Sequence, residues 1–295
     1  MNVLLTGASG LIAQSLYKKL IENNHQVHLL SAKLNKKLEH PYYSWNFKQN
    51  FIEKNALLNV DVIVHLAGAG IADEKWTSER KKLLLDSRVE TAKLLAQKVE
   101  NSAIKPKKYI SAGAIGIFAE NIFNADEKAK KGDDFMADLC NEWEESIVLF
   151  KNMGMQTALF RTGIVLDPNG GFYQQIAKLA KFFAAAVPGS GKQHFSWISL
   201  HDIVDMYYQA IIDDSIQGTY NATAPIPSTL QQAIKEICKK EKRPLLLPNI
   251  PPFILKLIYG EMAQVILSSK HVVPKKWLDE GRTFKHHSLA EYFND

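Results

Sequence analysis

Cysteine is scarce in this chain of 295 residues, where only Cys140 and Cys238 occur. Two thiols are too few for the disulfide framework of a secreted protein or for a zinc site built on cysteines. No apolar run approaches the ~18 residues of a membrane span. The first seven residues also lack the cationic start of a signal peptide. These absences predict a cytoplasmic protein with no membrane partner.

A strong excess of charge of one sign is also missing. The 36 Lys and Arg residues against 31 Asp and Glu residues leave a net charge of +5, and the basic residues are scattered. This distribution does not favour a nucleic-acid partner. Apolar residues make up 46% and charged residues 23%, which is typical of globular proteins. We therefore expect a globular protein, either a monomer or a homodimer, whose partner is a small molecule.

Short β-rich runs alternate with amphipathic stretches over the first 165 residues. The runs that predict strands are 3–5, 27–30, 60–66, 108–111 and 157–160. The stretches that predict helices are 11–22, 78–99 and 133–151. This alternation predicts parallel strands joined by right-handed crossovers, and strands that are apolar throughout predict a sheet covered on both faces. The expected fold class is α/β, with a doubly wound parallel sheet of the Rossmann type.

The pattern changes after Leu166, where a turn-forming cluster at 167–171 is followed by recurrent prolines. We expect residues 1–166 to form a dinucleotide-binding domain, which a helix and a strand within 200–224 rejoin. Residues 167–199 and 225–295 are expected to form a smaller substrate or cap domain.

The segment from Thr6 to Ala13 reads Thr-Gly-Ala-Ser-Gly-Leu-Ile-Ala and lies between the first expected strand and the first expected helix. Glycines there allow a tight turn, and the helix N-terminus presents unpaired N–H groups to an anion. A tight turn without a ligand is the alternative. The third small position is Ala13, which still permits close packing of helix on strand. The residues expected to contact a pyrophosphate are Gly7, Ala8, Ser9, Gly10, Leu11 and Ile12.

The spacing Gly-x-x-Gly-x-x-Ala resembles the short-chain dehydrogenase/reductase superfamily, in its extended branch. The block 65–69 follows a strand where the superfamily has a turn near the cofactor, and the block 161–166 follows another. The block 197–204 resembles the one before the last helix on the sheet in that superfamily. The segment 71–77 and the tail 243–284 resemble one atypical epimerase-like family. That family is related to sugar-nucleotide epimerases, has a C-terminal domain of its own, and is sometimes described as containing cell-division inhibitors. The resemblance implies further cofactor contacts at Leu66, Ala67, Gly68, Arg161 and Thr162.

The end of the second expected strand bears on the choice of cofactor. A site that prefers NAD places Asp or Glu there to bind the ribose 2′-hydroxyl. This chain reads Leu30-Ser31-Ala32-Lys33 and has no acid before Glu39. A hydroxyl and the Lys33 ammonium suit a 2′-phosphate, so we predict NADP(H) in preference to NAD(H). A solvated loop is the alternative reading of the lysines.

The superfamily usually transfers protons with a Ser and a Tyr-x-x-x-Lys pair, in which the Tyr is the acid or base. Here the Ser position falls on Gly113, and the Tyr and Lys positions fall on Met136 and Cys140. No tyrosine occurs between positions 109 and 173, so no shift of register restores the pair. The remaining catalytic candidates are Lys75, Arg88 and Ser111. Solvation or ion pairing would equally explain the two cations.

The nine histidines show no metal-ligand spacing, so we expect no metal. Cys140 lies within an expected helix, where a buried cysteine that fills apolar space is more common than a nucleophile. We predict an epimerase-, dehydratase- or reductase-like protein that binds NADP(H) and acts on a small molecule without the usual Ser, Tyr and Lys. The alternative is a non-catalytic dinucleotide-binding redox sensor or regulatory protein.

Overall fold

An eight-stranded sheet forms the centre of the computed structural model, which describes residues 1–32, 42–102 and 105–295. Across the sheet the strand order is β11-β7-β6-β5-β1-β2-β3-β4. These strands are β1 (Asn2–Thr6), β2 (Gln26–Ser31), β3 (Tyr42–Asn46), β4 (Phe51–Ile52), β5 (Val62–His65), β6 (Lys108–Ala114), β7 (Gln156–Thr162) and β11 (Gly218–Ala222). All neighbours pair in parallel except β3 and β4. The predicted doubly wound sheet is confirmed.

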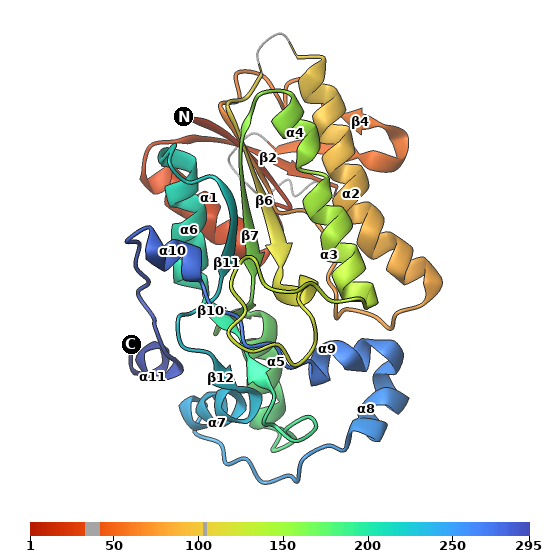
Figure 1. Ribbon diagram of the computed structural model, residues 1–295, viewed down its shortest axis with the longest axis vertical. Coiled ribbons are helices and arrows are strands. Elements are labelled where there is room, and N and C mark those ends of the chain that lie inside the picture. Colours follow the sequence, from red (N-terminus) through yellow and green to blue (C-terminus); the bar gives the residue numbers. More distant parts are fainter. Residues whose placement is uncertain (33–41, 103–104) are drawn as a thin grey trace.

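Helices cover both faces of this sheet (Figure 1). One face carries α2 (Ser78–Glu100), α3 (Phe135–Glu145) and α4 (Val148–Asn152), and the other carries α1 (Leu11–Glu22) and α6 (Leu200–Ile212). The prediction of a single helix over 133–151 is wrong, because the chain forms two helices that are divided at Ser146. The Ser146 hydroxyl donates to the Trp143 carbonyl oxygen at 2.6 Å. A serine that bonds to the backbone in this way competes with continued helix.

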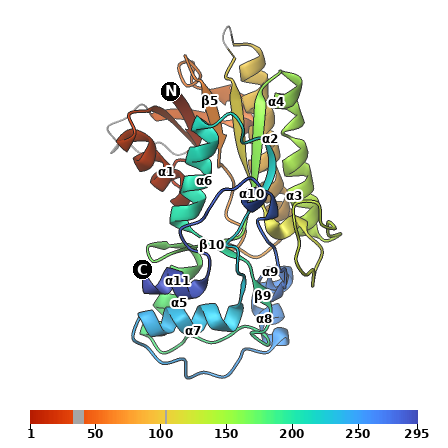
Figure 2. The same cartoon turned by 60° about the vertical axis from the view of Figure 1, so that its left-hand side comes forward.

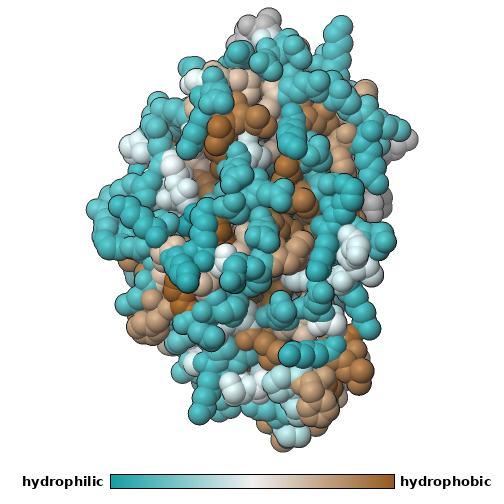
Figure 3. Space-filling model, turned by 45° about the vertical axis from the view of Figure 1, so that its right-hand side comes forward, coloured by the Kyte–Doolittle hydropathy of each residue, from teal (hydrophilic) through white to brown (hydrophobic). Residues whose placement is uncertain are grey.

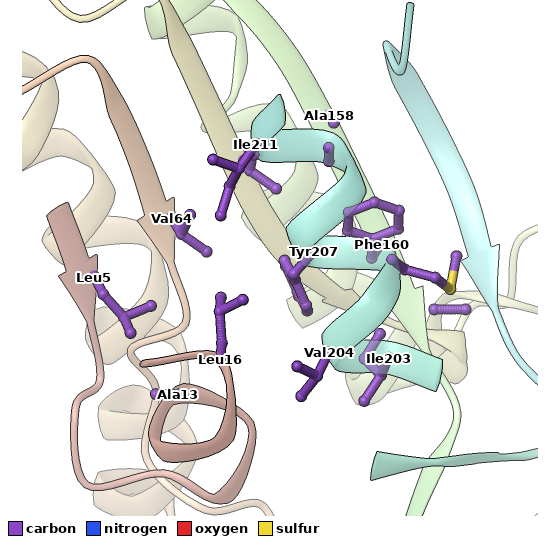
Figure 4. Close-up of a cluster of buried hydrophobic side chains, with 14 of the residues drawn as sticks. Leu5, Ala13, Leu16, Val64, Ala158, Phe160, Ile203, Val204, Tyr207 and Ile211 are labelled. Atoms are coloured by element: carbon purple, nitrogen blue, oxygen red, sulfur yellow. The ribbon is translucent and has the colours of Figure 1, made fainter. Parts of the chain in front are cut away.

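The core beneath α1 and α6 is apolar and fully covered. Figure 4 shows side chains of α6 and α1 converging with those of the strands. Val204, Tyr207, Phe160 and Leu16 are all at most 6% exposed. Burying a large apolar side chain of this kind stabilises a fold by about 1.5–3 kcal/mol. This packing holds the carboxyl ends of the strands, and therefore the loops that follow them, in fixed positions.

Most of the remaining elements are short and lie beyond the carboxyl ends of the central strands, whereas α10 lies beside β11 and α6 (Figures 1 and 2). Two small sheets pair β10 (Trp197–Ser199) with β8 (Ile164–Asp167), and β12 (Ser228–Thr229) with β9 (His194–Phe195). The helices are α5 (Gly171–Lys181), α7 (Leu230–Lys240), α8 (Pro252–Tyr259), α9 (Ala263–Leu267), α10 (Lys275–Asp279) and α11 (Leu289–Asn294). The described residues also contain three single 3-10 turns, namely η1 (Phe47–Gln49), η2 (Ile115–Ile117) and η3 (Gly260–Met262).

The C-terminal segment 268–276 returns to the central sheet. It pairs with the loop that follows β6, where His271 N donates to Ile122 O at 3.0 Å and Val273 N donates to Ala125 O at 3.0 Å. The side chain of Asn221, on β11, donates to the Val273 carbonyl at 3.0 Å. The loop after β6 is therefore held between the sheet and the C-terminal segment.

The surface in Figure 3 is mainly hydrophilic, and apolar side chains gather at its lower end. The described apolar residues with high exposure include Phe253, Leu257 and Ile258 of α8. Of the helices in the described ranges, none combines the length and the hydropathy needed to cross a membrane.

Candidate functional site

The turn after β1 requires glycine at its first position. Gly7 has φ +69°, and a Cβ there would lie 2.7 Å from the Leu66 carbonyl oxygen. Its own carbonyl accepts the Gly10 N–H at 2.8 Å, which closes the turn. The backbone of this turn is therefore packed directly against the chain after β5.

Helix α1 begins immediately after this turn, with Gly10 as its N-cap. Within the described residues, no side chain caps this helix end and no acidic residue stands in its first turn. The first N–H groups of a helix have no partner inside the helix, and the macrodipole adds positive potential there. This end of α1 can therefore receive an anion.

A first cavity of about 660 Å³ opens at the carboxyl ends of β1, β2, β3 and β5. The chain runs from β1 to β2 on one side and resumes with β5 on the other, so the cavity lies where the strand order reverses. The residues from the sequence prediction that line it are Gly7, Ser9, Ala67 and Gly68. Ser31, whose hydroxyl was expected to suit a 2′-phosphate, also lines it, and the residues that the prediction did not name as contacts include Lys48, Ser87 and Thr91.

Thr6 and His65 hold the chain that follows β5 in place through hydrogen bonds. Thr6 Oγ1 accepts the backbone N–H groups of Leu66 at 3.0 Å and Ala67 at 3.1 Å, and it contacts His65 Nδ1 at 2.9 Å. Because the two backbone N–H groups fill both acceptor sites of the Thr6 hydroxyl, the hydroxyl proton points to His65 Nδ1. The proton of the neutral imidazole is therefore on Nε2, which lies 3.2 Å from Thr91 Oγ1. Burial lowers the pKa of His65 to about 4. His65 is therefore neutral and structural.

Arg88 packs against the turn 66–70, which follows β5. Its guanidinium donates to the carbonyls of Ala69 at 3.0 Å and Leu84 at 2.8 Å, and it stacks over Trp143 at 4.9 Å. Burial lowers the pKa of Arg88 to about 10. Arg88 is not one of the described residues that line the first cavity. Its contacts position the turn 66–70.

The other predicted site residues are scattered. Lys75 is exposed on the loop before α2, and Ser111 is buried, donating to a neighbouring backbone carbonyl. Arg161 is buried in a bidentate ion pair with Glu144, at 2.7 and 2.8 Å. Lys33 lies outside the residues that the structure describes.

A second cavity of about 370 Å³ lies at the carboxyl ends of β6 and β7. Ala114, Thr162 and Met136 line it, and Met136 occupies the expected tyrosine position. The described residues that border this cavity include neither a tyrosine nor Arg88. The Tyr220 hydroxyl is instead bound to Glu280 at 3.1 Å, and the Tyr173 hydroxyl donates to Glu241 at 3.3 Å.

Cys140, at the expected lysine position, is fully buried. Burial raises the pKa of its thiol to about 12. A thiol with this pKa is not ionised near neutral pH, so it is a poor nucleophile. The packing role predicted for Cys140 agrees with this environment.

Lys270 and Glu120 add charge to the second cavity from segments that are far apart in the sequence. Lys270 Nζ lies 3.0 Å from the Gly116 carbonyl oxygen and 3.2 Å from a Glu120 carboxylate oxygen. Glu120 also accepts the Ser268 hydroxyl at 2.7 Å. Sequence reasoning missed both residues, since no local pattern relates the loop after β6 to the C-terminal segment.

Ser199, Asp202 and His286 form a separate buried cluster. Ser199 Oγ accepts the Asp202 N–H at 3.0 Å, which caps α6, and it donates to the Asp202 carboxylate at 2.7 Å. His286 Nδ1 lies 3.0 Å from Ser199 Oγ. The serine proton points to the carboxylate and Ser199 is 1% exposed, so the cluster anchors the C-terminal tail rather than activating a nucleophile. Across the described residues, no group of three or more His, Cys, Asp and Glu side chains could hold a metal ion.

Comparison with known protein families divides the chain into two matched regions. Residues 3–135 match the NAD dependent epimerase/dehydratase family. Residues 250–295 match a domain of unknown function, DUF1731. The second region contains Lys270 and the segment that returns to the loop after β6.

Similar proteins match nearly the whole chain. The chloroplastic epimerase family protein SDR39U1 homolog of Arabidopsis thaliana is 32% identical over 294 residues, which cover 97% of this chain and 84% of the relative. Epimerase family protein YfhF of Bacillus subtilis is 30% identical over 293 residues, which cover 98% and 95%.

Solved structures share the fold. Human epimerase family protein SDR39U1 (isoform 2), crystallised with NADPH, has a TM-score of 0.88 at 24% identity, over 99% of this chain and 98% of that one. UDP-glucose 4-epimerase of Thermotoga maritima, crystallised with UDP-glucose, has a TM-score of 0.79 at 19% identity, over 99% and 96%. The relatives and the two matched regions agree with the sequence resemblance: the chain belongs to the epimerase family, in the form that carries this C-terminal domain.

Proposed function

We propose that this protein binds NADP(H) across the carboxyl edge of its sheet and acts on a small molecule without the usual Ser, Tyr and Lys. The observation that carries the proposal is the uncapped N-terminus of α1, which follows a glycine turn on a cavity of about 660 Å³. When bound, the cofactor supplies or accepts a hydride at its nicotinamide ring.

The residues of the first cavity fit a dinucleotide. The N–H groups from Ala8 to Ile12 would bind the pyrophosphate, and Gly7 leaves room for it. Leu66, Ala67 and Gly68 would border the cofactor from the facing turn. Trp45, which lines the cavity and is mostly buried, would border the adenine.

The same cavity supports NADP(H) over NAD(H). Ser31 and Ala32 line it at the end of β2, where an NAD site would carry an acid. The cations available to a 2′-phosphate are Lys33, by its place in the sequence, and Lys48, which lines the cavity. NADPH in the human relative's crystal structure agrees with this preference.

The second cavity is the proposed place of the substrate. Both cavities border the segment 67–73. Residues 67–69 and Asp73 line the first cavity, and Ile71 lines the second. Thr162 lines the second cavity, and we assign Arg161 a positioning role there because its guanidinium is already paired with Glu144. Proton transfer would use the substrate itself, a water or another polar group of this cavity.

A non-catalytic dinucleotide sensor is the competing function, favoured by Met136 at the position of the usual acid. A fluorescence titration with NADPH and NADH tests the cofactor proposal. We expect saturable binding of NADPH, and absence of binding by either dinucleotide would contradict the proposal. NADPH oxidation in the presence of carbonyl compounds separates the enzyme from the sensor.

A further inference from the structure

The walls of the second cavity are mainly apolar. Ile71, Ile115, Met136, Ile164 and Val265 contribute aliphatic or thioether surface. A substrate of this cavity must therefore present apolar surface over most of its area, since polar groups facing these walls would lose their hydrogen bonds to water.

The second cavity has few charged residues, and its carboxylates outnumber its ammonium groups. Among the described residues that line it, Lys270 has the only permanent positive charge, and Glu120 and Asp134 have carboxylates. Asp134 also fills the N-terminus of α3, where its carboxylate accepts the Ala137 N–H at 2.9 Å. The helix end that could have received a phosphate is therefore already occupied by an acid.

The Lys270 ammonium has capacity for one further acceptor. Its side chain is 6% exposed, and its contacts to Gly116 O and Glu120 account for two N–H groups. A lysine has three N–H donors and accepts no hydrogen bond. The third can bind a neutral oxygen of a ligand, and a carbonyl oxygen is such an acceptor.

We propose that the second cavity binds a small, uncharged, largely apolar carbonyl compound, whose oxygen accepts a hydrogen bond from Lys270, and that it rejects nucleoside diphosphate sugars. This proposal rests on the proposed function, because the carbonyl group is what a nicotinamide cofactor would act on. It also separates this chain from the epimerase crystallised with UDP-glucose, with which it shares the fold.

Rejection of a diphosphate follows from the same residues. The pyrophosphate would bring negative charge next to Glu120 and Asp134, and its only fixed counter-charge among the described lining residues would be an ammonium already paired with Glu120. Charges that leave water need hydrogen-bonded partners of opposite sign, and this cavity does not offer enough of them. An uncharged ligand avoids that desolvation penalty.

Ligand binding to the protein saturated with NADP⁺ tests this inference, with saturation-transfer NMR as the readout. The probes are 2-octanone, cyclohexanone and UDP-glucose, and an NADPH titration of the same sample precedes them. We expect saturable signals from at least one ketone and none from UDP-glucose. UDP-glucose that binds saturably, or ketones that give no saturable signal, would overturn the inference. A sample that fails to bind NADPH would instead contradict the proposed function.

The variant Lys270→Met tests the assigned donor. It keeps an unbranched side chain of nearly the same length and removes the ammonium, so we expect at least ~10-fold weaker ketone binding with NADPH affinity unchanged. The matched control is Lys275→Met, which removes an exposed lysine of the same segment, paired with Asp279 on α10. Equal ketone affinities for the two variants would remove Lys270 from the proposal. If Lys270→Met fails to fold, as judged by its NADPH binding, Lys270→Leu takes its place with the same expectation, because leucine also lacks a donor.

Discussion

Gly7 and Gly10 face different constraints within one turn. A Cβ at Gly7 would meet backbone at 2.7 Å, whereas at Gly10 the nearest contact is Gly7 O at 3.2 Å, and its φ of −76° suits any residue. Gly10→Val should therefore fold and place a side chain where the pyrophosphate must approach. We expect at least ~10-fold loss of NADPH affinity, or ~1.4 kcal/mol, by titration calorimetry.

The control for this prediction is Ser9→Ala. Ser9 is exposed on the same turn, and the proposed pyrophosphate contacts use backbone N–H groups. We expect its NADPH affinity to change by less than about threefold, which corresponds to under ~1 kcal/mol. A folded Gly10→Val protein with wild-type affinity would contradict the assignment of this turn.

His65 predicts a specific loss of stability in acid. Burial lowers its pKa from 6.5 to about 4 in the folded chain. Below pH 6.5 the unfolded chain takes up a proton that the folded chain does not, so the free energy of unfolding falls as the pH drops from 6.5 to about 4. The loss due to this group is about 3 kcal/mol at one pKa unit per 1.36 kcal/mol.

Urea unfolding of the wild type and of His65→Gln at pH 7 and pH 4 checks this value. The variant lacks the titrating ring, so its stability should fall by about 3 kcal/mol less than that of the wild type over this range. Other histidines contribute equally to both proteins. Parallel curves would show that His65 is not a buried neutral group.

We expect the end of β2 to determine the choice of cofactor. Ser31 and Ala32 place no carboxylate at the 2′ position of a bound ribose, so we expect NADPH to bind more tightly than NADH in parallel fluorescence titrations. The margin should be modest, since one exposed lysine contributes ~1 kcal/mol or less. Ala32→Asp should reverse the order through repulsion of the 2′-phosphate. If the wild type and Ala32→Asp showed the same preference for NADPH over NADH, this role of β2 would be contradicted.

The C-terminal segment and β11 share one carboxylate. Glu127 accepts the N–H of Asn221 at 3.0 Å and that of Lys276 at 3.2 Å. Glu127→Ala leaves both donors without this acceptor, and we expect it to lower the free energy of unfolding by about 1–3 kcal/mol in urea titrations. Glu127→Gln retains a carbonyl acceptor and should have a smaller effect. Equal stability of Glu127→Ala and wild type would show that other contacts hold the segment.

Elements with a strong local pattern could be predicted from the sequence. The strand at 108–111 and the helix at 78–99 have apolar residues at the spacing that their burial requires, and both are present in the structure. The division at Ser146 could not be predicted, because it depends on whether one hydroxyl bonds to the backbone. Local periodicity carries no information on that choice.

For the molecule as a whole, the glycine turn was predictable and the second cavity was not. The turn is contiguous in sequence and needs a positive φ at Gly7. The cavity instead joins the loop after β6 to Ser268 and Lys270, far along the chain. Contacts of this separation follow from tertiary packing. The cytoplasmic location and the oligomeric state stay predictions.

We expect the chain to bind a dinucleotide at a site that has no tyrosine as the acid. A crystal structure of the protein with NADP⁺ tests this expectation. We expect the pyrophosphate at the N-terminus of α1 and the nicotinamide at the cavity lined by Met136 and Thr162. No tyrosine hydroxyl should lie within ~3.5 Å of the substrate side of the ring, the reach of a general acid or base. A pyrophosphate bound elsewhere would contradict the assigned cofactor site, and Tyr173 or Tyr220 beside the nicotinamide, with a lysine at hydrogen-bond distance, would restore the usual tyrosine acid.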